Sequence, residues 1–135
     1  MNKVVPKNEE YIFEGKVAIS QTNLKGDITF VNRKFCEISG YTLDELINTS
    51  HSIIKHPDFD KAIYEKMWRT LSGGQVYNGM IKNLRKDGRY YWTDIEIAPI
   101  IDSKGQITGY ISVSKPSPRK NIQENERLQQ NTNNK

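Results

Sequence analysis

The sequence is poor in the residues that build covalent cross-links and metal sites. It contains one cysteine, Cys36, and two histidines among 135 residues, which excludes an internal disulfide and every multi-cysteine metal site. It has no apolar run near the ~20 residues that a membrane-spanning helix needs, and no apolar segment typical of a signal peptide follows the N-terminus. We therefore expect a cytoplasmic chain with no direct membrane span and no metal.

The net positive charge is small over most of the chain, because its basic and acidic residues nearly balance. The net charge is +4, but the segment from Lys115 onward has five basic and two acidic residues, which leaves +1 for residues 1–114. A nucleic-acid-binding domain would carry a basic face on its body, so we expect no nucleic-acid partner. The sequence also lacks paired catalytic carboxylates, a nucleophile motif and a phosphate-binding glycine loop, and we expect no enzymatic activity.

The length fits one domain, which turn residues divide into short elements. We expect an N-terminal cap segment over residues 1–15, in which a short helix begins near Asn8 and ends at Gly15. Residues 17–22 and 28–31 have the composition of strands, and the turn between them contains Gly26. This pattern predicts a β-hairpin.

Capping signals after this hairpin predict several helices. The caps and stops are Asn32, Gly40, Thr42 with Glu45 three residues later, and Gly73 with Gly74. Pro57 forces the residues before it out of helical geometry. A longer helix is then predicted from about residue 58 to residue 71, with Asp58 as its N-cap.

Three further strands are predicted at residues 76–84, 90–101 and 106–114. In the middle one, period-2 alternation places Tyr91 and Thr93 on one face and Trp92 on the other. The predicted fold class is α+β: a five-stranded antiparallel sheet with short helices and one longer helix on one face. The domain spans residues 16–115, and residues 116–135 form a polar linker or the start of a signalling helix.

Several segments of the sequence carry a family resemblance. They are NRKFCEISGY at 32–41, EL at 45–46, HPD at 56–58, MW at 67–68, KNLRKDG at 82–88, YW at 91–92 and GYIS at 109–112. In this order they resemble a PAS domain, and most closely the FAD-binding PAS domain of Aer-type bacterial aerotaxis receptors. The resemblance covers residues 15–114 and implies a half-open α/β cup.

The resemblance also implies a redox and energy-taxis sensor that binds FAD non-covalently. Such a domain relays the flavin redox state by protein contact to a chemoreceptor signalling domain, in the same chain or in a separate one. A PAS–PAS homodimer belongs to the same expectation, as does a cytoplasmic location with membrane association only through the receptor partner.

A flavin ring needs apolar walls and a few amide or hydroxyl groups at its polar edge. The predicted strand face with Tyr77 and Asn83 offers both kinds of group, and Asn83 matches a ring-contacting Asn of the related light-sensing LOV domains. Thr93 stands where LOV domains have a second Asn. Ser112, with Ser114, is expected to point from the last strand toward the cavity. The alternative for Asn83 is a residue that satisfies the nearby hairpin turn.

Lys55, His56 and Asp58 match a turn that Aer-type domains need for FAD binding, in which Lys55 replaces an Arg. Lysine keeps the positive charge for a phosphate but loses the bidentate contact. His51 matches another histidine of that pattern. These residues also have purely structural interpretations, as a proline turn, a helix N-cap and an exposed loop.

Trp68 and Asn32 complete the predicted cofactor-binding set. The resemblance places Trp68, beside the apolar stripe of the long helix, on the adenine or ring side of FAD, and its alternative is a core residue. Asn32 faces the pocket in Aer-type relatives, and its alternative is a helix cap.

Two other functions stay open. One is a cofactor-free PAS module that dimerises through an apolar outer face of Val76, Met80 and Trp92. The other is a haem-based gas sensor, although His51 and His56 both precede the long helix that carries the axial ligand in haem PAS proteins. A light-driven cysteinyl adduct is excluded, because the LOV motif Asn-Cys-Arg-Phe is absent.

Overall fold

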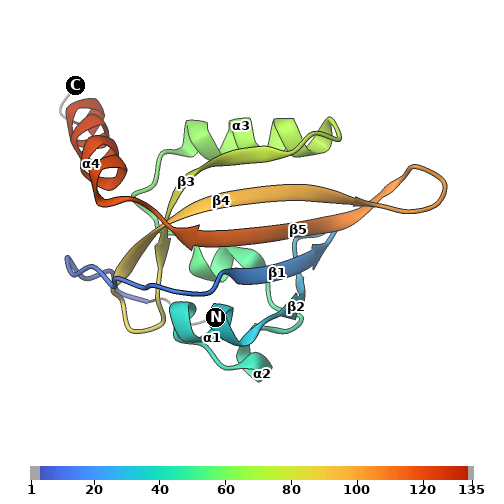
Figure 1. Cartoon of the computed structure of the whole chain (residues 1–135), viewed down its shortest axis with the longest axis horizontal. Helices are drawn as coiled ribbons and strands as arrows, with labels where there is room; N and C mark the ends of the chain where they lie inside the picture. The colour runs from blue at the N-terminus through green and yellow to red at the C-terminus, as the bar shows by residue number, and fades with distance from the viewer. Residues whose placement is uncertain (1–3, 134–135) are drawn as a thin grey trace.

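A computed structural model describes residues 4–133 of the chain. Its centre is a five-stranded sheet in the order β2-β1-β5-β4-β3 (Figure 1), and every neighbouring pair of strands is antiparallel. The strands are β1 (Ala18–Asn23), β2 (Ile28–Val31), β3 (Tyr77–Leu84), β4 (Tyr90–Ile101) and β5 (Ile107–Pro116). The helices are α1 (Arg33–Ser39), α2 (Leu43–Leu46), the 3-10 helix η1 (His51–Ile54), α3 (Lys61–Ser72) and α4 (Arg119–Asn133).

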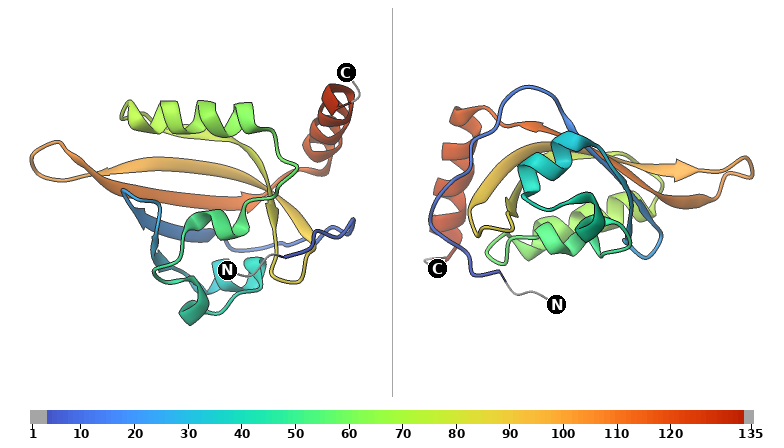
Figure 2. Two further views of the ribbon diagram at one scale, coloured as in Figure 1. Left: turned by 180° about the vertical axis from the view of Figure 1, so that it is seen from behind. Right: turned by 90° about the horizontal axis from the view of Figure 1, so that it is seen from below.

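The predicted α+β architecture is confirmed. The view from behind shows η1 and α3 in front of the sheet, with α1 and α2 beside them (Figure 2). The local caps are confirmed as well. The side chain of Asn32 accepts a hydrogen bond from the Phe35 amide, Gly40 ends α1 with φ of 80°, and Thr42 and Glu45 form a capping box.

The N-terminal segment is extended, and the short helix predicted there is wrong. Glu10 forms a parallel bridge with Tyr90 of β4, and the Tyr11 amide donates to the Tyr90 carbonyl at 2.7 Å. Strand β5 pairs with β4 only as far as Thr93, so the edge of β4 before that residue is free to accept this segment. One turn of isolated helix has too few hydrogen bonds to compete with a strand edge.

Helix α3 begins at Lys61, three residues later than its sequence suggested. Its N-cap is Asp60, whose Oδ1 accepts from the Ala62 amide at 2.9 Å. Asp58 is therefore not the N-cap, and the prediction for it is wrong. The amide of Asp58 instead donates to Nδ1 of His56 at 3.1 Å, within the turn that Pro57 creates.

The segment after β5 is helical. Ile122 of α4 is 3% exposed and packs in the same apolar cluster as Trp92, while Arg119 forms an ion pair with Glu10. None of the helices that the structure describes is both long and apolar enough to cross a membrane.

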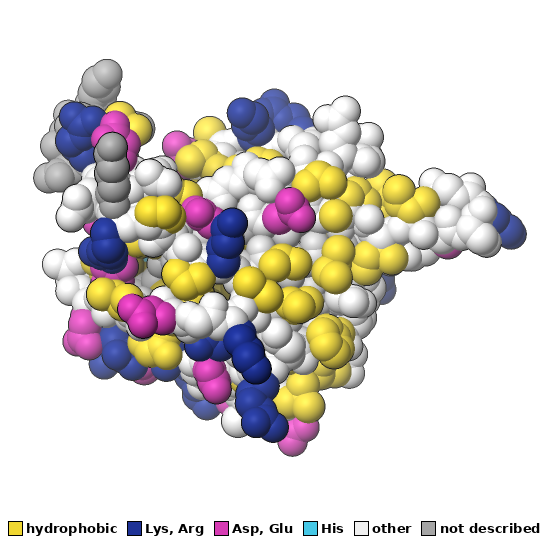
Figure 3. Space-filling view, viewed as in Figure 1, with side chains coloured by type: hydrophobic (Ala, Val, Ile, Leu, Met, Phe, Trp, Pro, Cys, Tyr) yellow, Lys and Arg dark blue, Asp and Glu magenta, His cyan; other side chains and the backbone are white. Residues whose placement is uncertain are grey.

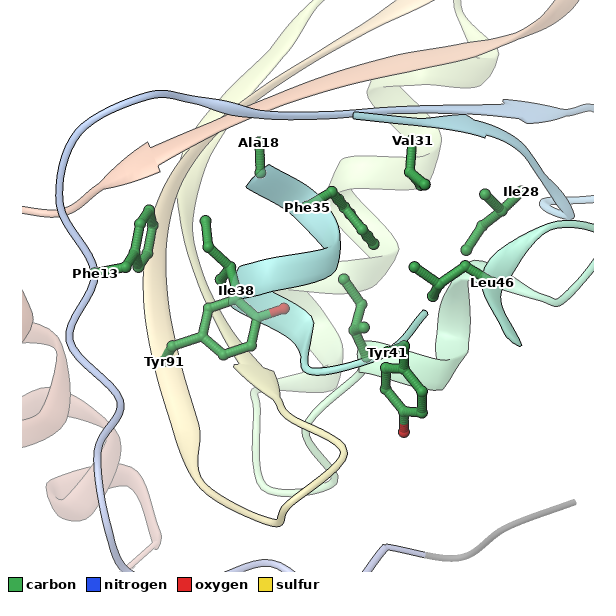
Figure 4. Packing of buried hydrophobic residues seen from close by; sticks show 10 residues of the cluster. Phe13, Ala18, Ile28, Val31, Phe35, Ile38, Tyr41, Leu46 and Tyr91 are labelled. Atoms are coloured by element: carbon green, nitrogen blue, oxygen red, sulfur yellow. The ribbon is translucent and has the colours of Figure 1, made fainter. Parts of the chain in front are cut away.

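Two apolar clusters hold the helices against the sheet. One surrounds α1 and includes Phe13, Phe35 and Tyr91 (Figure 4), with the rings of Phe13 and Tyr91 meeting edge to face at 6.3 Å. The other gathers residues of α3, β3 and β4 around Met67 and Leu71. The cavity described next is lined by residues of both clusters.

Candidate functional site

A cavity of about 430 Å³ lies between the inner face of the sheet and the helices. The sheet supplies small and polar side chains to it (Ala18, Ser20, Thr22, Asn83, Thr93, Ser112 and Ser114) and also the apolar and aromatic side chains of Ile81, Tyr91, Ile95, Ile97 and Tyr110. The helical side supplies mainly apolar and aromatic side chains: Phe35, Ile38, Ile54, Tyr64, Met67 and Trp68. Such a mixture is typical of pockets for a flat organic ligand with a polar edge.

Strand register brings the hydroxyl groups of the sheet together. Ser20 of β1 pairs directly with Ser112 of β5, and Ser114 pairs with Ala18 on one side and Ile95 on the other. Side chains on paired positions of an antiparallel sheet point to the same face. The short side chains of these residues leave space above the sheet and line it with groups that can both donate and accept hydrogen bonds.

Thr93 of β4 pairs with Ile81 of β3 and Pro116 of β5 and has an unsatisfied hydroxyl. The residue is 1% exposed, and among the described residues no partner forms a hydrogen bond with its Oγ1. A buried polar atom without a partner costs about 1–3 kcal/mol. Since Thr93 lines the cavity, a ligand there with a polar atom would remove that cost.

His51 lies in the cavity as a neutral imidazole. Its Nε2 lies 3.1 Å from Ser20 Oγ, and its ring meets Phe35 edge to face at 5.8 Å. Burial lowers the pKa of His51 from 6.5 to about 4, because a charged imidazolium is poorly solvated there. Because His51 belongs to η1 and is half-buried, the exposed-loop alternative for this residue does not hold.

The charged side chains of the cavity are all positive. Lys25 of the β1–β2 turn and Lys55, directly after η1, belong to its lining, and the described lining residues include no aspartate or glutamate. The Lys55 ammonium lies 4.6 Å from the centre of the Tyr64 ring, and burial raises the pKa of the Tyr64 phenol. This arrangement favours a ligand that carries negative charge.

Six of the predicted site residues line the cavity: His51, Lys55, Trp68, Asn83, Thr93 and Ser112. Trp68 is 44% exposed and its ring meets Tyr110 edge to face at 5.5 Å. Its exposure excludes the alternative of a core residue and places it where the cavity meets solvent. Asn83 is 4% exposed, and its backbone pairs with Lys55 across the free edge of β3.

Two predicted residues hold the fold beside the cavity. Asn32 Oδ1 accepts hydrogen bonds from the amides of Ile19 and Phe35, both at 3.0 Å, and its Nδ2 donates to the Val17 carbonyl. The Tyr77 ring lies along β3, with its hydroxyl 2.8 Å from the position that a Cβ on Gly79 would take. Neither residue lines the cavity, and a ligand contact for them stays a prediction.

His56 and Asp58 also lie outside the lining. His56 is 2% exposed, and its ring meets Tyr90 edge to face at 6.4 Å. Burial lowers its pKa, as does the charge of Lys82 to a smaller extent. These contacts support the structural interpretation of the His-Pro-Asp turn, and a direct role in cofactor binding stays a prediction.

The cavity is also lined by four residues that the sequence did not predict as site residues: Ser20, Thr22, Lys25 and Tyr64. A signal existed for Ser20 and Thr22, because period-2 alternation places them on one face of a predicted strand together with Ala18. No local signal marks Lys25 or Tyr64. Their position depends on how the turn and α3 approach the sheet.

A family model described as PAS fold matches residues 28–114. The aerotaxis receptor of Escherichia coli (strain K12) is 41% identical over 95 residues, which is 70% of this chain and 19% of the receptor. The nitrogen fixation regulatory protein of Klebsiella pneumoniae is 32% identical over 102 residues, 76% of this chain and 21% of that protein. The chain thus spans about a fifth of the length of these curated relatives.

Solved structures share the fold at lower identity. The light-state structure of the blue-light photoreceptor Aureochrome1 LOV has a TM-score of 0.71 and 23% identity, and the match covers 87% of this chain and 91% of that one. The PAS domain of a protein from Colwellia psychrerythraea has a TM-score of 0.69 and 23% identity, with 75% and 86% covered.

Proposed function

This chain belongs to the PAS family, as its sequence predicted, and we propose that it is a sensory domain that binds a flavin in the cavity between its sheet and helices. Its relatives include an aerotaxis receptor, and one structure of the same fold, with a TM-score of 0.73 and 22% identity, carries the description "Flavin Analogue Sheds Light on Light-Oxygen-Voltage Domain Mechanism". A PAS domain of this kind is a signalling module, and we propose no enzymatic activity for it.

The observation that carries the proposal is the buried, unpartnered hydroxyl of Thr93 in a cavity with apolar opposite walls. A bound flavin supplies a reversible redox centre whose N5 accepts a hydrogen bond when oxidised and donates one when reduced. The hydroxyls of Thr93 and Ser112 can serve both states, because a hydroxyl donates or accepts after rotation about its C–O bond. Asn83 offers an amide to the polar edge of the ring.

We further propose FAD as the flavin, held non-covalently. Lys25 and Lys55 give the cavity lining its positive charge and suit phosphate groups as point charges. Cys36 is absent from the lining, which supports binding without a bond to its sulfur. Trp68, half-exposed at the cavity, offers an aromatic face for the remaining part of the ligand.

The signal of a domain of this size has to leave through protein contact. We propose a chemoreceptor signalling domain as the receiving partner, in the same chain or a separate one, and a cytoplasmic place for the sensor. The relatives support this, because the aligned part is only a fifth of an aerotaxis receptor. A PAS–PAS homodimer is a further possible assembly.

The cofactor-free dimerisation module is the second candidate. Its expected outer face is less available than the sequence suggested, because Trp92 is 3% exposed and packs in one cluster with Ile122 of α4. Val76 remains 49% exposed, and Figure 3 shows further hydrophobic side chains on this face of the sheet. A dimer interface on this surface is therefore the form of the dimerisation module that can be tested.

The test is the visible absorption spectrum of the purified full chain, followed by denaturation and chromatography of any released ligand. We expect flavin bands that bleach with dithionite and return in air, and FAD as the released compound. A haem Soret band would support the gas-sensor alternative. A colourless protein that does not bind added FAD would overturn the flavin proposal and favour the dimerisation module.

A further inference from the structure

One end of the sheet lies away from both the N-terminal segment and α4. The strand register gathers the β1–β2 turn, the start of β3 and the β4–β5 hairpin at this end, because Asn23 pairs with Gly109 and Tyr77 pairs with Ile97. The β4–β5 hairpin projects beyond the other strands here, while the N-terminal segment and α4 lie at the opposite end (Figure 1). Neither of those two segments therefore covers the hairpin end.

Large apolar side chains are exposed at the hairpin end. Leu24 of the β1–β2 turn is 62% exposed, and Ile101 at the end of β4 is 54% exposed. Trp68 near the end of α3 is half-exposed, and its ring contacts Tyr110 of β5. Leu24 and Trp68 also line the cavity, so they stand at its opening. Exposed apolar groups that gather in one place mark an interaction surface.

An exposed cation follows each of these apolar groups within three residues: Lys25, Arg69 and Lys104. Within the described part of the chain, none of the three forms an ion pair. Two acidic residues lie near them. Asp27 is half-buried, and Asp102 Oδ1 accepts hydrogen bonds from two backbone amides of its own turn. The cations are therefore available to a partner with negative charge.

The shape of the hairpin end favours a fluid partner. We call its six residues the rim: Leu24, Lys25, Trp68, Arg69, Ile101 and Lys104. They stand on a turn, a helix and a hairpin, and the molecule tapers into that hairpin (Figure 3). A peptide helix needs a groove, whereas a lipid bilayer adapts to a tapering surface. Tryptophan prefers the depth of the lipid headgroups, and lysine and arginine are attracted to anionic headgroups.

We propose that the rim docks peripherally on an anionic lipid bilayer. Its apolar side chains enter the headgroup region, and its cations lie against lipid phosphates. Because only a few side chains enter the lipid, the contact is interfacial and reversible. The opening of the cavity, which Leu24 and Trp68 line, then faces the bilayer. Docking does not depend on the bound ligand, so it stands apart from the proposed flavin function.

The test is co-sedimentation of the full chain with vesicles of phosphatidylcholine alone and with vesicles of equal parts phosphatidylcholine and phosphatidylglycerol. We expect binding to the mixed vesicles at low salt, and a partition coefficient that falls at least about threefold at high salt. Ile101→Ser and Lys104→Glu should each lower this coefficient at least about threefold. Neither residue lines the cavity, so the effect does not pass through the ligand.

Ile12→Ser and Lys16→Glu are the matched controls. Both residues are exposed, and both lie in or next to the N-terminal segment at the other end of the domain. We expect neither change to alter the partition coefficient. Equal losses in the control and rim variants would overturn the proposal, since charge elsewhere on the chain would then carry the binding. Absence of binding to the mixed vesicles at low salt, or equal binding to both kinds of vesicle, would overturn it as well.

Tryptophan fluorescence identifies the side chain that enters the lipid. The chain has two tryptophans, of which Trp68 is half-exposed and Trp92 is buried. Lipids with brominated acyl chains quench only an indole that reaches them, so we expect quenching in the wild-type chain and its loss in Trp68→Phe. Quenching that persists in Trp68→Phe would contradict docking through the rim. A chain that binds vesicles but no added FAD would overturn the proposed function and leave the docking in place.

Discussion

Arg85 Nη1 donates a hydrogen bond to the carbonyl oxygen of Ile38 at 2.5 Å, across 47 residues of chain. The same nitrogen donates to the Glu37 carbonyl at 2.9 Å, so the guanidinium satisfies carbonyl groups at the C-terminal end of α1. Its other face lies 3.8 Å from the centre of the Tyr11 ring. One side chain of the β3–β4 hairpin therefore joins this hairpin to α1 and to the N-terminal segment.

Replacement of this guanidinium should destabilise the fold. We expect Arg85→Lys to lower the free energy of unfolding by about 2 kcal/mol, because lysine lacks the planar guanidinium that donates to the two carbonyls and at the same time stacks on Tyr11. Urea unfolding measures the change. The control is Arg127→Lys, an exposed arginine that pairs with Glu124, for which we expect less than about 0.5 kcal/mol. Equal losses in both variants would contradict the role of Arg85.

Thr93→Val should separate stability from ligand binding. Valine has nearly the same shape and removes the unpartnered hydroxyl, so we expect the ligand-free protein to gain about 1 kcal/mol of unfolding free energy. Affinity for flavin should fall about fivefold or more as its hydrogen bond is lost. Thermal unfolding of ligand-free protein and fluorescence titration with FAD measure the two effects. Thr108→Val, on the exposed part of β5, should change neither. An unaltered FAD affinity in Thr93→Val would remove this hydroxyl from the binding site.

His51 should make stability depend on pH in mildly acidic solution. Its pKa is near 4 in the fold and about 6.5 in the unfolded chain, so the unfolded chain binds more protons below pH 6.5. Stability should therefore be complete above that pH and fall as the pH drops from 6.5 toward 4. Between pH 7 and pH 5 we expect the wild-type chain to lose about 2 kcal/mol more than His51→Gln.

Urea unfolding of both proteins at the two pH values measures this difference. His56 also has a lowered pKa, but it is present in both proteins and its contribution cancels. If the two proteins lost the same stability, His51 would not be the group that titrates.

The positive side chains of the cavity should discriminate between flavins. We expect Lys25→Gln and Lys55→Gln each to weaken FAD several-fold, by about 1 kcal/mol, because each removes a charge that faces phosphate groups. Riboflavin, which has no phosphate, should bind both variants as it binds the wild-type chain. Titrations at low and high salt measure this selectivity, with Lys104→Gln in the β4–β5 turn as the control. A parallel loss of riboflavin binding would indicate a packing role for the lysines.

Local rules predicted much of the fold. The capping box of Thr42 and Glu45 involves residues three positions apart, and the strand limits of β2 and β4 follow from turn residues next to them. The face of β4 that carries Thr93 follows from alternation alone. Each of these features is decided within a few residues of chain, where sequence patterns are informative.

The features of the fold and of the cavity that the sequence did not predict depend on contacts between distant segments. The N-terminal segment looks like a short helix in isolation, but a bridge from Glu10 to the open edge of β4 at Tyr90 holds it extended. Asn32 has the sequence signal of a cap and is one, yet it also binds the Ile19 amide, which keeps it outside the cavity. Lys25 and Tyr64 reach the cavity only because the β1–β2 turn and α3 converge on it.

The ion pair between Glu10 and Arg119 joins residues 109 positions apart and holds the N-terminal segment against the start of α4. A force that pulls the two ends apart would strain this ion pair and the adjacent edge of β4 before it strained any wall of the cavity. Force applied at the two ends would therefore act on α4 and the N-terminal segment first and leave the walls of the cavity largely unstrained.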